Sequence, residues 1–165
     1  MKKFVFFVIM AITLGGCATS GPKYSQYEST ISPVSAEKAR LYFFRQSKFA
    51  AGGVDAPIYV NGEEVGEAAN KSYFFADVTP GRMVLKTESK MAPGVHVMET
   101  DVEAGNNYYI EVQVNEAYIS SGVVLGLIGQ SAYVASHKNS SCWLFQPTPT
   151  EEAIPKLKEL AFSKD

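Results

Sequence analysis

The two histidines of this chain, His96 and His137, are the first residues to test for catalytic or metal chemistry. A zinc site needs three or four ligands at recognisable spacing, and the sequence contains no HxH, HExxH or CxxC pattern. A hydrolase needs a nucleophile, a base and an orienting acid. His137 is close in sequence to Ser140 and Ser141, but no serine lies in a Gly-x-Ser-x-Gly turn. The sequence therefore predicts no metal, no cofactor, no catalytic residue and no enzyme.

Charged side chains supply two further candidates. Glu63, Glu64 and Glu67 are clustered, and two carboxylates at the right separation could hydrolyse a glycosidic bond. The alternative is a charged strand edge that opposes aggregation. Arg45 ends an apolar segment and could bind a carboxylate or a sugar, or it could pair with a nearby acid to fix the end of a strand. We favour the structural role in both cases.

The N-terminus has the pattern of a secretion signal. Two lysines precede a continuous apolar run at residues 4–14, which is too short for a bilayer core that needs about 20 helical residues. This length and these flanks are typical of the apolar region of a signal peptide, and two glycines before Cys17 suit a signal peptidase. We expect residues 1–16 to be removed.

The Leu-Gly-Gly-Cys sequence at residues 14–17 resembles the lipobox of bacterial lipoproteins. The resemblance implies that diacylglycerol alkylates the Cys17 thiol, that cleavage falls just before this residue, and that the mature N-terminus carries three acyl chains such as palmitate. Each buried methylene contributes about 0.8 kcal/mol, so membrane lipid would hold the protein firmly. Ala18 in place of Asp implies the outer membrane, facing the periplasm, by the sorting rule of enteric-type bacteria. The alternative is an ordinary secretory signal with a chance cysteine.

Composition limits the remaining chain. Residues 17–36 are rich in Ser, Thr, Gly and Pro and read as the lipidated N-terminus with a flexible tether, and residues 37–165 suffice for a single domain. A net charge of −2 with no basic stripe excludes a nucleic-acid partner. Cys142 has no partner cysteine once Cys17 is lipidated, so we expect it to be buried in the oxidising periplasm.

Short β-type segments separated by Gly, Pro and Asn turns dominate this domain. We expect strands at residues 39–46, 57–61, 64–68, 72–76, 83–89, 95–102, 108–114, 131–135 and 142–146. Asn61-Gly62 is the strongest hairpin signal. Alternation in residues 108–114 predicts that Tyr109, Glu111 and Gln113 face solvent. The predicted fold is all-β: an antiparallel β-sandwich, immunoglobulin-like or transthyretin-like, after the signal peptide and tether.

The C-terminus predicts a short helix packed on the sandwich. Residues 148–151 match a capping box with proline at the first helical position, and apolar residues then recur at helical spacing. Pro155 interrupts this spacing, which indicates a kink or a late start.

Several of these segments resemble the domain-of-unknown-function 2846 family of bacterial lipoproteins. The similar motifs are LYFFR at residues 41–45, IYVNG at 58–62, VG at 65–66, KSYF at 71–74, PGR at 80–82 and AGNNYY at 104–109. Asn106-Asn107 departs from the family, which often has Lys or Gln there. The resemblance implies a secreted β-sandwich domain and implies no activity.

Residues 122–129 are the most unusual stretch of the chain. They are uncharged and aliphatic, with three glycines: Gly122, Val123, Val124, Leu125, Gly126, Leu127, Ile128 and Gly129. They could form a buried strand or loop, a short helix or loop packed on the sandwich, or an exposed patch that contacts lipid or a partner. The last possibility makes them the candidate interaction patch.

These observations favour a non-catalytic binding module that engages an envelope protein or lipid. The alternative is a peptidoglycan- or glycan-binding module, because Tyr24, Tyr59, Tyr108, Tyr109 and Trp143 could stack on sugars. An enzyme of unidentified class is the third possibility. A buried segment at residues 122–129 would count against the first hypothesis.

Overall fold

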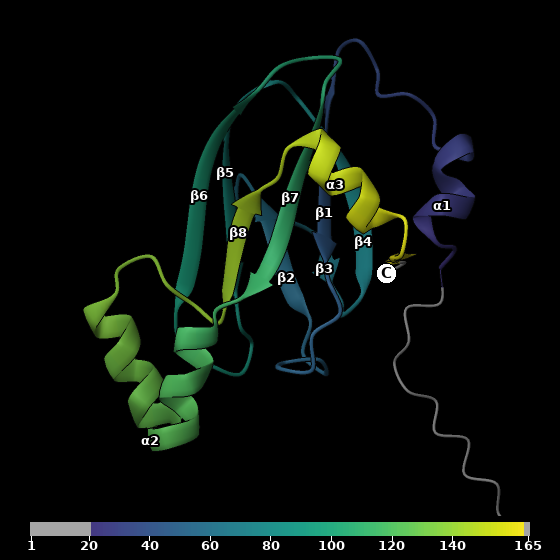
Figure 1. Ribbon diagram of the computed structural model, residues 1–165. Helices are drawn as coiled ribbons and strands as arrows, with labels where there is room; N and C mark the ends of the chain where they lie inside the picture. The colour runs from purple at the N-terminus through teal and green to yellow at the C-terminus, as the bar shows by residue number, and fades with distance from the viewer. Residues whose placement is uncertain (1–20, 164–165) are drawn as a thin grey trace, which may run out of the picture.

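The computed structural model describes residues 21–163, which form a two-layered β-sandwich (Figure 1). Its strands are β1 (Ala39–Arg45), β2 (Ala56–Val60), β3 (Glu63–Ala68), β4 (Ser72–Val78), β5 (Gly81–Glu88), β6 (Val95–Val102), β7 (Asn107–Val114), β8 (Trp143–Pro147) and β9 (Ala161–Phe162). Its helices are α1 (Tyr24–Tyr27), the 3-10 helix η1 (Glu28–Thr30), α2 (Glu116–Ser136) and α3 (Thr150–Leu157). The predicted all-β sandwich with a short C-terminal helix is confirmed, while the predicted signal peptide and Cys17 lie outside the described residues.

The two sheets have the strand orders β8-β7-β1-β4-β9 and β3-β2-β5-β6. The expectation of purely antiparallel sheets is wrong at two places, because β1 runs parallel to β7 and β4 runs parallel to β9. Parallel neighbours need a long crossover, and the chain between β1 and β7 forms the whole second sheet. As a consequence, β1 and β7 end at the same end of the sandwich.

The main core lies between the sheets. The side chains of Leu41, Phe43, Ile58, Leu85 and Trp143, which come from both layers, are 0% exposed. Burial of each large apolar side chain contributes about 1.5–3 kcal/mol. This core explains why the period-two apolar pattern in the sequence located the strands.

The hairpin between β2 and β3 turns at Asn61-Gly62, as predicted. Their φ angles are 52° and 91°, the positive values that a type I′ turn requires. Asn61 Oδ1 also accepts a hydrogen bond from the Val84 amide over 2.9 Å, which ties the turn to β5.

A second, aromatic core covers the outer face of the five-stranded sheet. Tyr42 and Tyr109 stack there with ring centroids 5.0 Å apart, and Leu157 of α3 is fully buried against this cluster. The prediction that Tyr109 and Glu111 face solvent is therefore wrong, since they are 8% and 6% exposed. The alternation was correct, but α1 and α3 cover the face that it assigned to water (Figure 1).

The expected flexible tether is wrong where the described chain begins. The Tyr24 amide donates to the Leu160 carbonyl over 2.9 Å, and the Tyr24 side chain is only 4% exposed. Its ring packs edge-on against Tyr73 at 5.2 Å. One aromatic side chain with a site in the outer core is sufficient to dock this polar segment, so the chain is attached to the domain from Pro22 onward.

The C-terminal helix is present, with a different start. Pro149 is the N-cap of α3 and no side chain caps it, so the expected capping box is wrong. Thr148 instead extends the strand, because its amide donates to the Tyr109 carbonyl over 2.9 Å. Pro155 lies inside the helix, which nonetheless continues to Leu157.

Two expectations fail in α2. The strand predicted at residues 131–135 is helical, and residues 122–129 are neither a buried strand nor a loop packed on the sandwich. A short apolar run has no periodicity that separates a strand from a helix. The helix formed by this segment projects from one end of the sandwich (Figure 1).

Candidate functional site

Helix α2 is a helical hairpin. Its backbone reverses at Gly126, whose φ and ψ of 59° and −144° are non-helical and lie close to a region that essentially only glycine adopts. By length and apolar composition, α2 is the one helix of the described chain that could cross a membrane. The reversal divides it into two shorter arms, so it does not run straight in this structure (Figure 1).

The two arms approach each other closely at the other glycines of the segment. A Cβ atom added to Gly129 would lie 2.2 Å from the Ser121 carbonyl oxygen, and one added to Gly122 would lie 2.5 Å from Gln130 Nε2. Gly129 has no room for a side chain because it meets backbone, whereas a side chain at position 122 would require the Gln130 side chain to move. The three glycines that made this stretch unusual therefore build the hairpin, one at the turn and two where the arms meet.

The base of the hairpin is fixed to the sandwich. Asn115 is the N-cap, and its Oδ1 accepts from the Tyr118 amide over 3.2 Å. Its Nδ2 donates to Ser140 Oγ at 3.1 Å and to the Ser141 carbonyl at 3.0 Å. The Tyr118 hydroxyl donates to the Pro93 carbonyl over 2.6 Å, and burial raises the pKa of Tyr118 to about 12.

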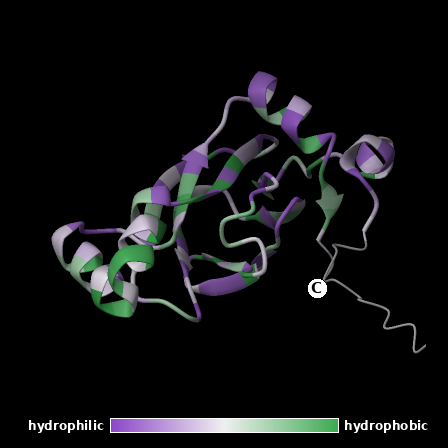
Figure 2. Ribbon diagram, turned by 60° about the horizontal axis from the view of Figure 1, so that its bottom comes forward, coloured by the Kyte–Doolittle hydropathy of each residue, from purple (hydrophilic) through white to green (hydrophobic). Residues whose placement is uncertain are grey.

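The tip of the hairpin exposes a cluster of aliphatic side chains. The exposed fractions are 81% for Val123, 76% for Val124, 63% for Leu125, 63% for Leu127 and 79% for Ile128. Figure 2 shows this hydrophobic tip standing away from the sandwich. Contiguous exposed apolar patches are uncommon on monomeric proteins and mark interaction sites. Of the three interpretations of residues 122–129, exposure is the one that the structure shows.

Two more exposed apolar side chains lie at the same end of the molecule. Phe49, in the loop after β1, is 104% exposed, and Met91, in the loop after β5, is 76% exposed. We call this end, which includes α2, the two loops and the turn between β3 and β4, the hairpin end. Sequence reasoning missed both residues, because a single apolar residue in a loop carries no periodic signal.

The described chain also begins at the hairpin end. In the register of the five-stranded sheet, Arg45 at the end of β1 faces Ser72, and Ser72 faces Ala161. Lys23 forms an isolated bridge with Ala161. Lys23 therefore lies level with the strand ends from which α2 departs, at the opposite edge of the sheet.

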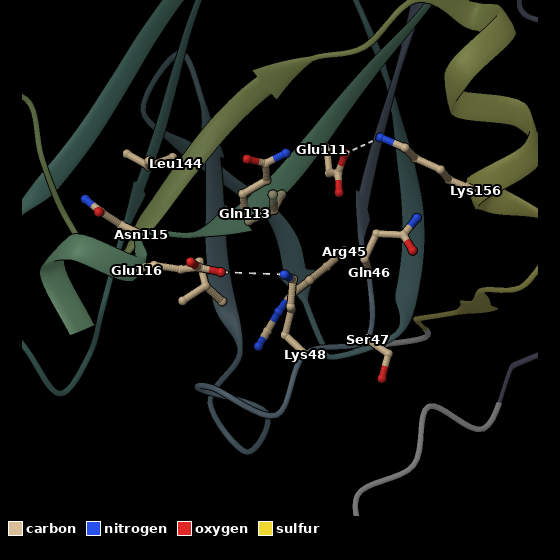
Figure 3. Close-up of a pocket in the computed structure, with 12 residues that line it drawn as sticks. Arg45, Gln46, Ser47, Lys48, Glu111, Gln113, Asn115, Glu116, Leu144 and Lys156 are labelled. Atoms are coloured by element: carbon tan, nitrogen blue, oxygen red, sulfur yellow. Dashed lines mark hydrogen bonds and ion pairs between the residues drawn. The ribbon is translucent and has the colours of Figure 1, made fainter. Parts of the chain in front are cut away.

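A polar pocket of about 600 Å³ lies beside the hairpin base (Figure 3). Lys156 Nζ of α3 lies 2.8 Å from Glu111 Oε2, and Lys48 Nζ lies 3.6 Å from Glu116 Oε1. Gln113 also lines the cavity. The pocket offers amides and matched charges, which could hydrogen-bond a polar ligand, and the residues that line it include no nucleophile paired with a base.

The histidines and serines considered for catalysis are not assembled into a site. The His137 ring stacks on Tyr133 at 4.1 Å, and its Nδ1 lies 3.0 Å from the Tyr133 carbonyl oxygen. Ser140 accepts the Asn115 hydrogen bond described above, and the Ser141 hydroxyl donates to a backbone carbonyl. His96 lies 3.0 Å from another carbonyl oxygen. Within residues 21–163, no group of three or more His, Cys, Asp or Glu side chains could hold a metal.

The three clustered glutamates lie on β3, at one edge of the smaller sheet. Glu63 and Glu64 are exposed at the start of β3, which is an edge strand. Glu67 forms an ion pair with Lys90. Charges on an exposed strand edge oppose pairing with another chain, as the structural alternative predicted.

Arg45 is a buried structural residue. Its guanidinium donates to the carbonyls of Ala51 at 2.6 Å and Val54 at 2.7 Å, and it lies 4.3 Å from the centre of the Trp143 ring. It is 1% exposed, and burial lowers its pKa. Arg45 therefore has the structural role that the sequence favoured, but its partners are backbone carbonyls of the loop after β1 in place of the expected acid.

The aromatic residues considered for sugar stacking do not form a common surface. Tyr24, Tyr109 and Trp143 are 4%, 8% and 0% exposed and belong to the two cores. Tyr59 lies against a lysine ammonium 4.1 Å away, and the Tyr108 hydroxyl accepts a backbone hydrogen bond. The observation that motivated a glycan-binding role is therefore lost for three of the five residues.

Cys142 is buried, as expected from its unpaired position in the sequence. It is 4% exposed, and burial raises the pKa of its thiol. It therefore contributes to packing between the sandwich and α2.

The sequence pattern of a family described as "Protein of unknown function (DUF2846)" matches residues 35–124. The chain belongs to this family. An uncharacterized protein of Haemophilus influenzae is 30% identical over 121 residues, which cover 71% of this chain and 67% of the relative. The DUF2846 match spans β1 to β7 and ends within the first arm of α2, whereas the second arm, β8, α3 and β9 follow it. Membership in DUF2846 agrees with the sequence resemblance and assigns no activity.

Proposed function

We propose that this DUF2846 protein is a lipid-anchored, non-catalytic binding module of the bacterial cell envelope. Cys17 carries the lipid and holds the domain at the periplasmic face of the outer membrane. The hairpin end of the sandwich is the surface that binds.

The exposed apolar tip of α2 carries this proposal. Five large aliphatic side chains lie in water on a hairpin whose base is fixed by Asn115 and Tyr118. Burial of each such side chain would contribute about 1.5–3 kcal/mol of free energy, which the exposed tip does not gain. A second surface that covers them would recover this free energy.

In-cell crosslinking tests the proposal. A photoreactive amino acid at Val124 should crosslink reproducibly to an envelope component, either lipid or protein. The matched control is Val84, an exposed valine on β5 that is 38% exposed and distant from the hairpin end. If positions 124 and 84 give the same products, the hairpin end is not the binding surface.

The anchor is tested separately with Cys17→Ala. The natural protein should incorporate a radiolabelled fatty acid and sediment with membranes, while the variant should incorporate none. Equal labelling of the two proteins would contradict lipidation at Cys17.

A further inference from the structure

We infer that the apolar tip of α2 inserts into the same membrane that holds the lipid of Cys17, so that the hairpin end lies flat on the bilayer. This inference rests on the proposed lipid anchor and names lipid as the occupant of the binding surface. It would convert a protein tethered at one point into one with a fixed orientation.

The lengths of the two connections agree with this arrangement. Five residue steps separate Cys17 from Pro22, where the chain docks on the sandwich, and a fully extended chain covers at most about 17 Å over that distance. The first arm of α2 runs from Glu116 to the turn at Gly126, a rise of about 15 Å. Both connections leave the same end of the sandwich. A membrane that contacts the hairpin tip is therefore within reach of the Cys17 lipid.

The distribution of side chains at the tip favours hydrocarbon over a protein groove. A helix that docks in a protein groove presents one apolar face, with anchors three or four residues apart. Here Val123, Val124, Leu125, Leu127 and Ile128 follow one another around a turn and are all exposed, so they point in several directions. A tip that is apolar on all sides matches a fluid environment that contacts every side equally.

The residues behind the tip suit the headgroup layer. Phe49 and Met91 are exposed on neighbouring loops of the hairpin end, and interfacial aromatic and apolar side chains add to membrane binding. Lys71 and Lys138 are exposed at the same end, where they can meet lipid phosphates, while Lys48 is paired with Glu116. Among the described residues, the large apolar side chains that are more than 60% exposed all lie at the hairpin end.

The depth of the tip can be measured on the lipidated full chain. Val124→Cys, labelled with an environment-sensitive dye, is reconstituted in vesicles of phosphatidylethanolamine and phosphatidylglycerol. Buried Cys142 should not react, and the chain without the added cysteine verifies this. Val84→Cys is the matched control. The dye at position 124 should shift to the blue and be quenched by nitroxide-labelled lipid, while the dye at position 84 should be quenched by aqueous iodide.

A second variant tests insertion without a label. In the Cys17→Ala background, Val124→Asp should weaken binding to the same vesicles by at least about tenfold, whereas Val84→Asp should leave it unchanged. Positions 124 and 84 are both exposed, so circular dichroism should show both variants folded.

The outcomes separate this inference from the proposed function. If the tip dye stays in water on protein-free vesicles while Val124 crosslinks to a protein in cells, lipid insertion is wrong and the binding function stands. If the tip neither enters lipid nor crosslinks in cells, both are wrong. If it enters lipid but Cys17 carries no fatty acid, the hairpin binds membranes without the proposed anchor, and the orientation inferred here is overturned.

Discussion

The substitution Gly126→Ala tests the hairpin most sharply, because the helix reverses at this residue. An alanine at φ 59° and ψ −144° would place its Cβ in a backbone region that side-chain-bearing residues avoid. Holding a residue in such a region costs about 1–3 kcal/mol. The chain could escape this cost only if α2 straightened.

The rest of the structure prevents straightening. A continuous helix of 21 residues is about 31 Å long. The six residues from 137 to 142 reach at most about 20 Å, yet the Cys142 carbonyl accepts from the Asn115 amide at 2.8 Å. A straight α2 would therefore detach β8 from β7. We expect Gly126→Ala to lower the free energy of unfolding by about 1–3 kcal/mol and the melting temperature by roughly 4–10 °C.

Urea and thermal unfolding followed by circular dichroism measure this effect. Gly53→Ala is the control, because an added Cβ there meets nothing within 4 Å and the φ angle is ordinary. The reasoning is refuted if both variants unfold at the same midpoint. It would also be refuted if Gly126→Ala kept full stability with an extended α2, because the connection to β8 would then be longer than the structure allows.

Three further predictions concern residues that support the sandwich and the hairpin base. Asn115→Ala removes the N-cap and leaves the Ser141 carbonyl without its donor, so urea unfolding should show a loss of about 2 kcal/mol. Hydrogen bonds from buried Arg40 at 2.6 and 2.8 Å hold the pKa of the Asp77 carboxyl below its usual value. The pair thus stabilises the fold above about pH 4 and loses this contribution as the pH falls through the depressed pKa, so Asp77→Asn should cost about 1–2 kcal/mol at pH 7 and less at pH 3 in urea titrations. The Cys142 thiol should resist maleimide in the native protein and react in denaturant, and rapid native labelling would contradict its burial.

The sequence predicted the strands well because most of them have one face in the main core. Residues 58–62 illustrate this success, since the apolar Ile58 and the Asn61-Gly62 turn are where the pattern placed them. The same reasoning failed for the outer face of β1 and β7. Continuous apolar residues in β1 signal a strand covered on both sides, but which segment covers it depends on distant residues such as Tyr24 and Leu157.

The composition of residues 122–129 located the candidate site but left its structure open among three interpretations. The aliphatic and glycine-rich character of residues 122–129 distinguished them, but it fits a buried strand as well as an exposed hairpin. The hairpin is distinguished by the ψ angle of Gly126 and by the close approach of Gly129 to Ser121. Both features depend on the three-dimensional structure and leave no pattern in the sequence. Phe49 and Met91 joined the surface only when the strand register brought their loops to the same end.

The connection between β7 and β8 in the larger sheet does not require a segment as long as the α2 hairpin. Strands β7 and β8 are antiparallel neighbours, and such neighbours can be joined by a turn of two residues. This chain instead makes the connection through a hairpin that adds only Tyr118 and Gly129 to the buried residues while it leaves five large aliphatic side chains in water. The hairpin base packs on the sandwich through Tyr118, but the five exposed side chains at the tip do not stabilise the isolated domain. The apolar tip is therefore best explained by a surface outside the domain, and we propose that this surface is the membrane.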